Sequence, residues 1–276
     1  MTRVALATCR RLPEPDPDET LLLDALRARG AAAEMLAWDD EAADPAAFDL
    51  CVIRSTWNWA ERPAAFRAWV RTAAAETTLL NAAAAVEYGL HKRYLRDLET
   101  RGVAVVPTRF CDRGVPTSLR DVARAEGWDD VVIKPAVSAG SWMTCKTHAA
   151  EDDGQRHLEA ILAERDAMIQ PYVPGAERAL VWIDGACTHA VTKQPRFHGG
   201  EESVSGAQRV ESFERIVVDH ALGDWADGLL YARVDVMPDE SGAPMVSELE
   251  IVEPSLFLLQ HAPALERFVT AILARA

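Results

Sequence analysis

The sequence predicts a mixed α/β fold in which a small open α/β domain precedes two α+β lobes. Two observations favour this class. In the first third of the chain, apolar runs of strand length alternate with segments of helical spacing. In the last third, pairs of apolar runs flank short turns, as in β-hairpins. A chain of 276 residues has room for three such units, which we place at 1–85, 86–173 and 174–276.

The composition excludes several classes of protein. With 49% hydrophobic and 26% charged residues, the chain is expected to be globular. No apolar stretch is long enough to span a membrane, and residues 1–9 predict a first strand rather than a signal peptide. The net charge of −14 disfavours a nucleic-acid surface. We therefore expect no membrane or nucleic-acid partner, and a monomer or homodimer.

The cysteines indicate a reducing compartment. Their number is odd, they are widely spaced, and none forms a C-x-x-C pair; they are Cys9, Cys51, Cys111, Cys145 and Cys187. This pattern is typical of reduced, mostly buried thiols in a cytoplasmic protein.

Residues 1–85 predict the open α/β domain. Apolar runs indicate strands at 3–7, 34–38 and 50–53, and helical spacing indicates helices at 19–29 and 62–75. In open α/β sheets, ligands gather beyond the carboxyl ends of the strands. The segment 54–59 leaves the third strand at that end.

This segment contains a candidate substrate site. Arg54 offers a planar fork of donors that suits a carboxylate, Ser55 adds a hydroxyl, and Trp57 supplies an apolar wall. We expect these residues to bind a substrate that carries a carboxylate. The alternative is that Arg54 pairs with Glu61 or Asp49 and the tryptophans only cover the sheet edge.

The middle third predicts a second sheet with a phosphate-binding lysine. Its expected helices span 91–102, 119–126 and 155–164, and its expected strands span 103–108, 131–135, 143–146 and 167–170. Lys134 closes an apolar strand and is followed by a small-residue loop, Ser138-Ala139-Gly140-Ser141. A lysine on one phosphate, with loop amides on the others, would explain this order. The alternative is an ordinary surface lysine.

The last third predicts two hairpins separated by a loop. The first pairs 179–183 with 188–192 around Asp184-Gly185, and the second pairs 230–237 with 244–250 around Ser241-Gly242. Between them we expect a polar loop at 194–208 and a helix at 210–222, and after them a closing helix at 263–275. Lys193 ends the first hairpin much as Lys134 ends its strand.

The second hairpin carries the strongest chemical signal. Side chains alternate across a strand, so a turn at Ser241-Gly242 places Asp235 opposite Glu248 and Arg233 opposite Glu250. Three carboxylates on one face repel one another unless a cation is near, and one arginine cannot neutralise them all. Such oxygen clusters suit Mg²⁺. The alternative is a solvated face without an ion.

Several common catalytic patterns are absent from the sequence. There is no P-loop, no G-x-G-x-x-G, no H-E-x-x-H and no G-x-S-x-G. These absences disfavour a P-loop nucleotidase, a Rossmann dehydrogenase, a zinc protease and an α/β-hydrolase.

Taken in order, these motifs resemble the ATP-grasp superfamily of ligases over about the last two thirds of the chain. The matching elements are Lys92, the 131–135 strand, the 138–141 loop, Gln170-Pro171-Tyr172-Val173, Glu177, Lys193, Arg233-x-Asp235 and Glu248-x-Glu250. Other segments are similar to the glutathione synthetase-like branch, and within it to the O-ureido-serine cyclo-ligases: Arg54-Ser55-Thr56-Trp57, Lys92-Arg93-Tyr94-Leu95, Gln170-Pro171-Tyr172-Val173, Asp184-Gly185 with His189-Ala190, and Glu253-Pro254-Ser255-Leu256. Glu250 stands where many members have Asn.

The resemblance implies an ATP-grasp fold, with an N-terminal pre-ATP-grasp domain and two lobes that enclose ATP. It assigns Gln170, Tyr172 and Val173 to the adenine and Glu177 to the ribose. It also implies that Lys92, Lys134, Lys193 and the 138–141 loop bind the phosphates. Asp235, Glu248 and Glu250 would hold two Mg²⁺ ions, and Arg233 and Lys193 would act at the transferred phosphate. Ser255 would join Arg54, Ser55 and Trp57 at the substrate.

The resemblance further implies the reaction. ATP would phosphorylate the carboxylate of a small amino-acid-like molecule, and an amine-type nucleophile would displace phosphate to form an amide-type C–N bond, as in antibiotic biosynthesis. An intramolecular cyclo-ligase, a kinase that stops at the acylphosphate and a non-catalytic nucleotide-binding module remain as alternatives.

Overall fold

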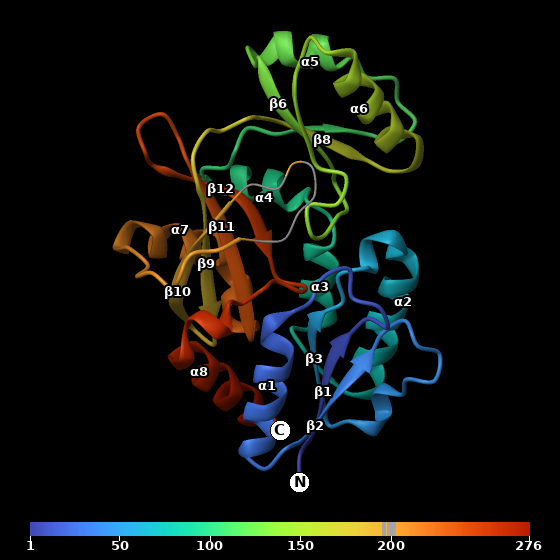
Figure 1. Ribbon diagram of the computed structural model, residues 1–276, viewed down its shortest axis with the longest axis vertical. Helices are drawn as coiled ribbons and strands as arrows, with labels where there is room; N and C mark the ends of the chain where they lie inside the picture. Colours follow the sequence, from blue (N-terminus) through green and yellow to red (C-terminus); the bar gives the residue numbers. More distant parts are fainter. Residues whose placement is uncertain (195–196, 198–202) are drawn as a thin grey trace.

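The computed structural model describes residues 1–194, 197 and 203–276, whose strands form three four-stranded sheets. Figure 1 shows the central sheet at the top, the C-terminal sheet at the left and the N-terminal sheet below. Part of the expected 194–208 loop, residues 195–196 and 198–202, lies outside the described residues. The residue boundaries between the predicted domains stay a prediction.

The N-terminal sheet is parallel, with the order β2-β1-β3-β4. Its elements are β1 (Arg3–Thr8), α1 (Pro17–Ala28), β2 (Ala32–Ala37), β3 (Leu50–Ser55), α2 (Pro63–Glu76) and β4 (Thr78–Leu80), with short 3-10 turns at Pro45–Ala47 and Trp59–Glu61. Helix α1 begins at the Asp16 cap, whose side chain accepts a hydrogen bond from the Asp18 amide. Strand β3 is buried along its whole length, as expected of a parallel strand covered by helices.

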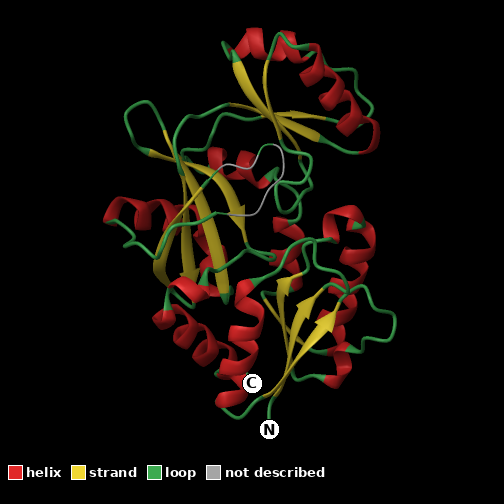
Figure 2. Cartoon of the chain, viewed as in Figure 1, coloured by secondary structure: helices red, strands yellow, loops and turns green. Residues whose placement is uncertain are grey.

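The central sheet is antiparallel, with the order β5-β8-β6-β7. This region of the chain contains α3 (Ala83–Gly89), α4 (Tyr94–Thr100), β5 (Arg109–Cys111), α5 (Leu119–Glu126), β6 (Asp130–Pro135), β7 (Cys145–His148), α6 (Asp152–Glu164) and β8 (Ala167–Pro171). Helices α5 and α6 cover one face of the sheet and enclose a core of their own around Ile133, Leu158 and Ile169 (Figure 2).

The C-terminal sheet is antiparallel, with the order β10-β9-β11-β12. Its elements are β9 (Glu177–Ile183), β10 (Ala186–Lys193), α7 (Ser212–Leu222), β11 (Tyr231–Pro238), β12 (Pro244–Glu250) and α8 (Ala262–Leu273), with 3-10 turns at Gly223–Asp227 and Leu258–Gln260. Alternate β9 residues point to opposite faces: Leu180 packs in the core with α7, and Val181 packs in the core with α8.

One hydrophobic core joins the N-terminal sheet to the C-terminal sheet. Leu26 of α1, Val52 of β3, Val181 of β9 and Phe268 of α8 belong to the same cluster of buried side chains. The N-terminal and C-terminal regions are therefore one packed body. One face of the central sheet has a separate core, whereas Met168 of β8 packs with Leu180 and Val234 of the C-terminal sheet. Hydrogen bonds and ion pairs link the central sheet to the rest, among them the Arg165 guanidinium on the Ala60 carbonyl at 3.0 Å.

The chain enters and leaves the central sheet through neighbouring strands. Arg109, at the start of β5, pairs with Ile169 near the end of β8. The entry and the exit therefore lie side by side at one end of that sheet.

The strand predicted at 103–108 is wrong. The structure has only an isolated bridge there, between Val105 and Val246 of β12, and strand β5 begins later, at Arg109. The apolar residues Val103 and Val106 are buried because this extended segment runs along the C-terminal sheet before the chain crosses to the central one. Strand β4 and helix α3 were not expected from the sequence.

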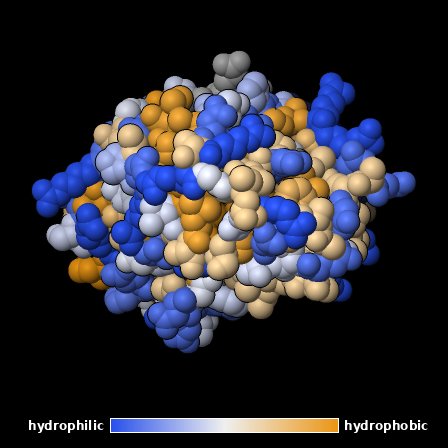
Figure 3. Space-filling model, turned by 90° about the horizontal axis from the view of Figure 1, so that it is seen from below, coloured by the Kyte–Doolittle hydropathy of each residue, from blue (hydrophilic) through white to orange (hydrophobic). Residues whose placement is uncertain are grey.

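The five cysteines all lie among the described residues and are free, as predicted; Cys145 is the only one of them that is not buried. In the described region of the chain, no helix is long and apolar enough to cross a membrane. Seen from below, hydrophobic and hydrophilic residues are interspersed on the surface of the molecule (Figure 3).

Candidate active site

A cavity lies between the central sheet, the C-terminal sheet and the loops of the N-terminal domain. Most of the predicted site residues line it: Trp57, Lys92, Lys134, Ser138, Ala139, Gly140, Ser141, Gln170, Tyr172, Val173, Glu177, Lys193, Arg233, Glu248, Glu250 and Ser255. They come from positions up to about two hundred residues apart, so the fold brings them together.

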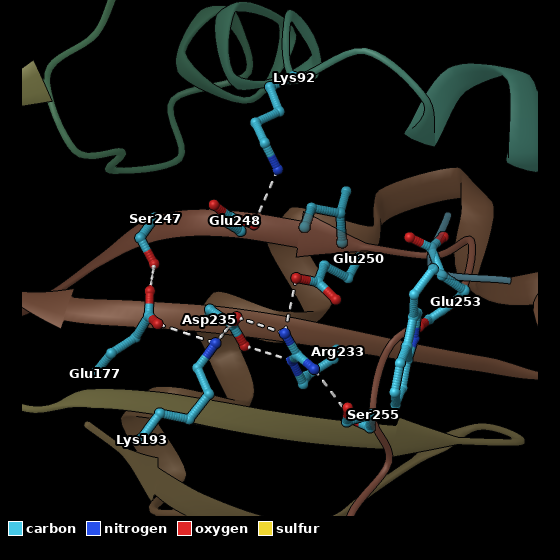
Figure 4. Close-up of polar contacts among 12 residues, drawn as sticks. Lys92, Glu177, Lys193, Arg233, Asp235, Ser247, Glu248, Glu250, Glu253 and Ser255 are labelled. Carbon is cyan, nitrogen blue, oxygen red and sulfur yellow. Dashed lines mark hydrogen bonds and ion pairs between the residues drawn. The ribbon is translucent and has the colours of Figure 1, made fainter. Parts of the chain in front are cut away.

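The register of the acidic hairpin is as predicted. Arg233 of β11 lies opposite Glu250 of β12, and Asp235 lies opposite Glu248. A bulge after Asp235 shifts the pairing in the rest of the hairpin. Figure 4 shows these side chains on one face of the sheet. Val181 of β9 lies opposite Arg233 on this same face of the sheet and belongs to the hydrophobic core. One face of the sheet therefore borders the core at one end and the cavity at the other.

Arginine and lysine side chains interleave with these carboxylates. Arg233 binds Asp235 through two nitrogens, at 2.8 and 2.9 Å, and reaches Glu250 at 2.7 Å. Lys193 contacts Asp235 at 2.5 Å and Glu177 at 2.9 Å. The repulsion expected within the acidic cluster is therefore largely compensated.

Glu248 joins the two sheets that line the cavity. Its Oε1 lies 2.5 Å from the Lys134 ammonium of β6, and its Oε2 lies 3.0 Å from the Lys92 ammonium, which precedes α4. Both lysines are almost fully buried. Lys134 is thus no ordinary surface lysine: it spans the cavity to a carboxylate of the other sheet.

The ion pairs set the protonation of the cluster. Burial alone would raise the pKa of Glu248, but Lys134 and Lys92 hold it well below its ordinary value. Asp235 likewise has a lowered pKa, because Arg233 and Lys193 outweigh the effect of its burial. Burial raises the pKa of Glu250 to about 8, against the pull of Arg233. The neighbouring cations therefore favour the ionised forms of Asp235 and Glu248, whereas burial disfavours the ionised form of Glu250.

The donor set suits a divalent cation. All three candidate ligands present carboxylate oxygens on one hairpin, the chemistry that Mg²⁺ prefers. Asp235 is fully buried beneath Arg233 and Lys193 and does not line the cavity. Among the described residues, no three acidic, histidine or cysteine side chains converge as they stand, because these carboxylates are turned onto basic groups. A cation would take the place of such a basic partner.

The predicted nucleotide-binding residues of the central sheet and its loops line the cavity. Gln170 is buried and donates to the Thr108 hydroxyl at 2.9 Å. The ring of Tyr172 packs against the Lys146 ammonium, 3.4 Å from its centroid, and edge-on against Phe197. In the small-residue loop, Gly140 and Ser141 have φ of 58° and 59°, so the chain turns sharply there.

Two predicted substrate residues lie away from the cavity wall. Arg54 is buried, with its guanidinium 5.6 Å from the ring centroid of Tyr231 and 5.8 Å from that of Phe268. Ser55 is buried too and hydrogen-bonds to Thr8. This placement does not support the expected contact with substrate, because side chains from the C-terminal region of the chain cover this end of β3. Arg54 pairs with neither Glu61 nor Asp49; Asp49 binds Arg3.

The other two substrate candidates do reach the cavity. The Trp57 indole donates to the backbone carbonyl of Glu253 at 3.1 Å, and the Ser255 carbonyl accepts from Arg233 at 3.1 Å. The segment after β12 thus ties the N-terminal domain to Arg233.

The cavity also has wall residues for which the sequence predicted no role. Ser247 donates to Glu177 at 2.6 Å, and Glu253 faces the cavity beside Ser255. Lys146 lies behind the wall, over the ring of Tyr172. Lys146 pairs with Val132, two residues before Lys134, and this alternation is a signal in the sequence that could have found it.

Two comparisons of the sequence find similar proteins. The profile of the N-terminal domain of D-cycloserine synthetase DcsG matches residues 4–81. The cycloserine biosynthesis protein DcsG of Streptomyces lavendulae is 32% identical over 282 residues, which cover 94% of this chain and 94% of that protein.

Solved structures extend the likeness to the fold. The crystal structure of D-cycloserine synthetase DcsG has a TM-score of 0.88 at 30% identity, covering 99% of each chain. The ATP-grasp ligase PsnB, complexed with a phosphomimetic variant of its minimal precursor, Mg and ADP, has a TM-score of 0.66 at 17% identity, covering 100% of this chain and 99% of that chain. This second likeness concerns the fold alone.

Proposed function

The chain belongs to the family of the cycloserine biosynthesis protein DcsG and is an ATP-dependent, C–N bond-forming ligase of the ATP-grasp fold; from this premise we propose that it acts on the carboxylate of a small amino-acid-like molecule. One observation carries the proposal: lysines from three separate segments of the chain and the acidic hairpin meet in a single cavity.

The proposed reaction has two steps. A carboxylate oxygen of the substrate attacks the terminal phosphorus of ATP, and ADP leaves. A nitrogen nucleophile then attacks the acyl carbon of the acylphosphate, phosphate leaves with the bonding electron pair, and the nitrogen gives up a proton. Positioning and charge neutralisation supply most of the catalysis in phosphoryl transfer, and no side-chain nucleophile is needed.

The chain's own cations would carry the first step. Lys92, Lys134 and Lys193 are held at the cavity by carboxylates, and phosphate oxygens offer them equivalent partners. The guanidinium of Arg233 is fixed by Asp235 and by the Ser255 carbonyl, so it is preorganised to hold the transferred phosphoryl group.

The remaining roles follow the position of each residue. Gln170, Tyr172, Val173 and Glu177 would bind the adenosine, and Ser138, Ala139, Gly140 and Ser141 would close over the phosphates. Asp235, Glu248 and Glu250 would hold Mg²⁺, which neutralises phosphate charge when bound. Trp57 and Ser255 would contact the substrate. Asp235 lies directly behind the wall residues Arg233 and Lys193. Arg54 and Ser55 are left out, because Arg54 packs against Tyr231 and Phe268 and Ser55 bonds to Thr8, and neither lines the cavity.

A non-catalytic nucleotide-binding module is not favoured. Such a module has no use for a buried set of carboxylates matched by lysines from three segments of the chain. The relative that is 32% identical is itself named for biosynthesis.

The test is a screen for ADP and phosphate release over amino acids and their derivatives, beginning with O-ureidoserine, with mass spectrometry of the products. We expect ADP release that depends on the added carboxylate, and no release with matched amino alcohols. Hydroxylamine is added in parallel, since it traps an acylphosphate as a hydroxamate.

The outcomes separate the alternatives. A new product with a C–N bond supports the ligase. Within that result, a product formed from one substrate molecule with loss of water indicates ring closure, and a product that contains two substrates indicates intermolecular joining. ADP release that yields only hydroxamate indicates a kinase. No ADP release with any carboxylate contradicts the proposal.

A further inference from the structure

Glu253 lies on the cavity wall beyond the end of β12, away from the nucleotide-binding residues. In Figure 4, Glu177 and Lys193 lie on the left, Arg233 and Glu250 in the middle, and Glu253 with Ser255 on the right. If the nucleotide occupies the Glu177 side and the transferred phosphate lies at Arg233, the Glu253 side is the end left for the second substrate.

Trp59 and Trp57 fix the position of Glu253. The Trp59 indole donates to its Oε1 at 2.6 Å, and the Trp57 indole donates to its backbone carbonyl at 3.1 Å. Trp59 is itself buried and stacks on Phe66, with ring centroids 5.7 Å apart. The carboxylate is therefore preorganised by a rigid aromatic support from the N-terminal domain.

Glu253 differs in its partners from Glu177 and from the three carboxylates of the acidic hairpin. Glu177, Asp235, Glu248 and Glu250 each have a lysine or arginine nitrogen within 3.0 Å. Within the described region of the chain, Glu253 forms no such ion pair, and no group donates to its Oε2. One acceptor oxygen at the substrate end of the cavity is thus left for a ligand.

The surroundings of Glu253 favour the arrival of a cation. Burial raises the pKa of Glu253 to about 7, although the Trp59 hydrogen bond and the charges of Lys92, Arg233 and Arg54 oppose the rise. A positive group in direct contact would offset the burial of this carboxylate.

We propose that Glu253 is a substrate-binding residue whose Oε2 accepts hydrogen bonds from the ammonium group of the amino-acid-like substrate, while Trp59 holds Oε1. This inference rests on the proposed function and adds the group that recognises the amine. An α-ammonium carries three N–H donors and a positive charge, which complement a half-buried carboxylate. The substrate carboxylate would then point away from Glu253, toward Arg233.

Glu253→Gln is the informative variant. The side-chain carbonyl of Gln can still accept from Trp59, so the local fold is kept, while the negative charge is lost. Glu240→Gln is the matched control, because Glu240 is exposed in the turn of the β11–β12 hairpin, outside the cavity. Circular dichroism and thermal melting check that both variants fold.

Binding is measured by calorimetry with O-ureidoserine and with its counterpart that lacks the α-amino group, each in the presence of a non-hydrolysable ATP analogue. We expect the wild-type protein and the Glu240→Gln variant to bind the amino compound at least about tenfold more tightly than the des-amino compound. The Glu253→Gln variant should lose most of this preference and should bind the ATP analogue unchanged.

The outcomes test the role of Glu253 separately from the proposed ligase function. A Glu253→Gln variant that keeps the full preference overturns the inference, as does a wild-type protein that shows no preference or binds neither compound. A lower turnover with unchanged binding of both compounds also overturns it. If the preference is lost as expected but the wild-type protein releases no ADP with any carboxylate, the inference stands and the proposed function fails.

Discussion

The two antiparallel sheets that line the cavity differ in their chemistry and in their packing. The C-terminal sheet supplies the carboxylates of the acidic cluster, whereas the central sheet supplies Lys134, the small-residue loop and the Gln170–Tyr172 segment. One face of the C-terminal sheet shares its core with the N-terminal domain, whereas the face of the central sheet under α5 and α6 encloses a core of its own. Contacts such as Lys134 with Glu248 link the two.

This difference suggests a division of labour between the sheets. Reactions that develop charge need groups held in fixed positions, and the acidic hairpin belongs to the larger packed body. Groups that enclose a nucleotide must let it in and out, and several of the residues that we propose for this role lie on the central sheet. Lys134 and Glu248 form one of the contacts between the two sheets.

The largest effect is expected at Glu248. Glu248→Gln keeps the shape and removes the charge that Lys92 and Lys134 share, so we expect ADP formation to fall by at least about 1,000-fold, roughly 4 kcal/mol. The variant should be folded but less stable at neutral pH, because two buried lysines lose their anion. Steady-state kinetics and thermal melting measure the two effects.

Glu248→Asp is the matched control for charge. It retains the anion and moves its oxygens back by about one methylene, so stability should recover more than the rate does. Near-normal turnover in the Glu248→Gln variant would remove the acidic cluster from the mechanism.

A second prediction compares the two cores through one type of substitution. Leu158 in α6 and Leu26 in α1 are both fully buried leucines in helices, the first in the core of the central sheet and the second in the shared core. Each change to Ala should cost about 2–5 kcal/mol. In hydrogen exchange, Leu158→Ala should loosen the segment 109–171, and Leu26→Ala should loosen the N-terminal domain, the C-terminal sheet and α8.

The two variants are compared by which segments exchange hydrogen faster, rather than by how much faster they exchange. Equal loosening of β11 and β12 by Leu158→Ala would mean that the central sheet is not a separate cooperative unit.

The smallest effect is a gain in stability at Asp16, the cap of α1. Burial raises the pKa of Asp16 to about 6, although Arg54 pulls it down, so the charged form is disfavoured in the folded state. The resulting destabilisation is absent below about pH 4 and grows as the pH rises through 6. Asp16→Asn can keep the cap and should stabilise the protein by about 1–3 kcal/mol at pH 8 and hardly at all at pH 4.

Urea unfolding at the two pH values measures this change. A loss of stability at pH 8 would show that the attraction between Asp16 and Arg54 outweighs the cost of burying the carboxylate.

The local geometry of the acidic hairpin could be predicted from the sequence, because strand alternation and one short turn fix which side chains oppose each other. Asp235 opposite Glu248 required no knowledge of the rest of the chain. The cations that reach the same face could not be predicted from spacing alone. Lys92 and Lys134 arrive from elements more than a hundred residues away, and only the packing of the lobes brings them to Glu248.

Arg54 shows the opposite case. An arginine at the end of an apolar strand fits a ligand site in an isolated sheet. In the folded chain, Tyr231 and Phe268 cover it, and they come from about two hundred residues away. Similarly, Val103 and Val106 have the character of a strand, but the surface that buries them belongs to the other sheet.

The neighbouring entry and exit of the central sheet have a consequence for how such chains evolve and can be engineered. Because Arg109 and Ile169 are paired, the segment between them is tied to the rest of the protein at closely spaced points, as an inserted domain is. It can be exchanged as a cassette for the equivalent segment of a relative, provided that Lys134 is retained. A chimera of this kind would replace the small-residue loop and Lys146, which packs on Tyr172, while Gln170, Tyr172 and the acidic hairpin stay as they are.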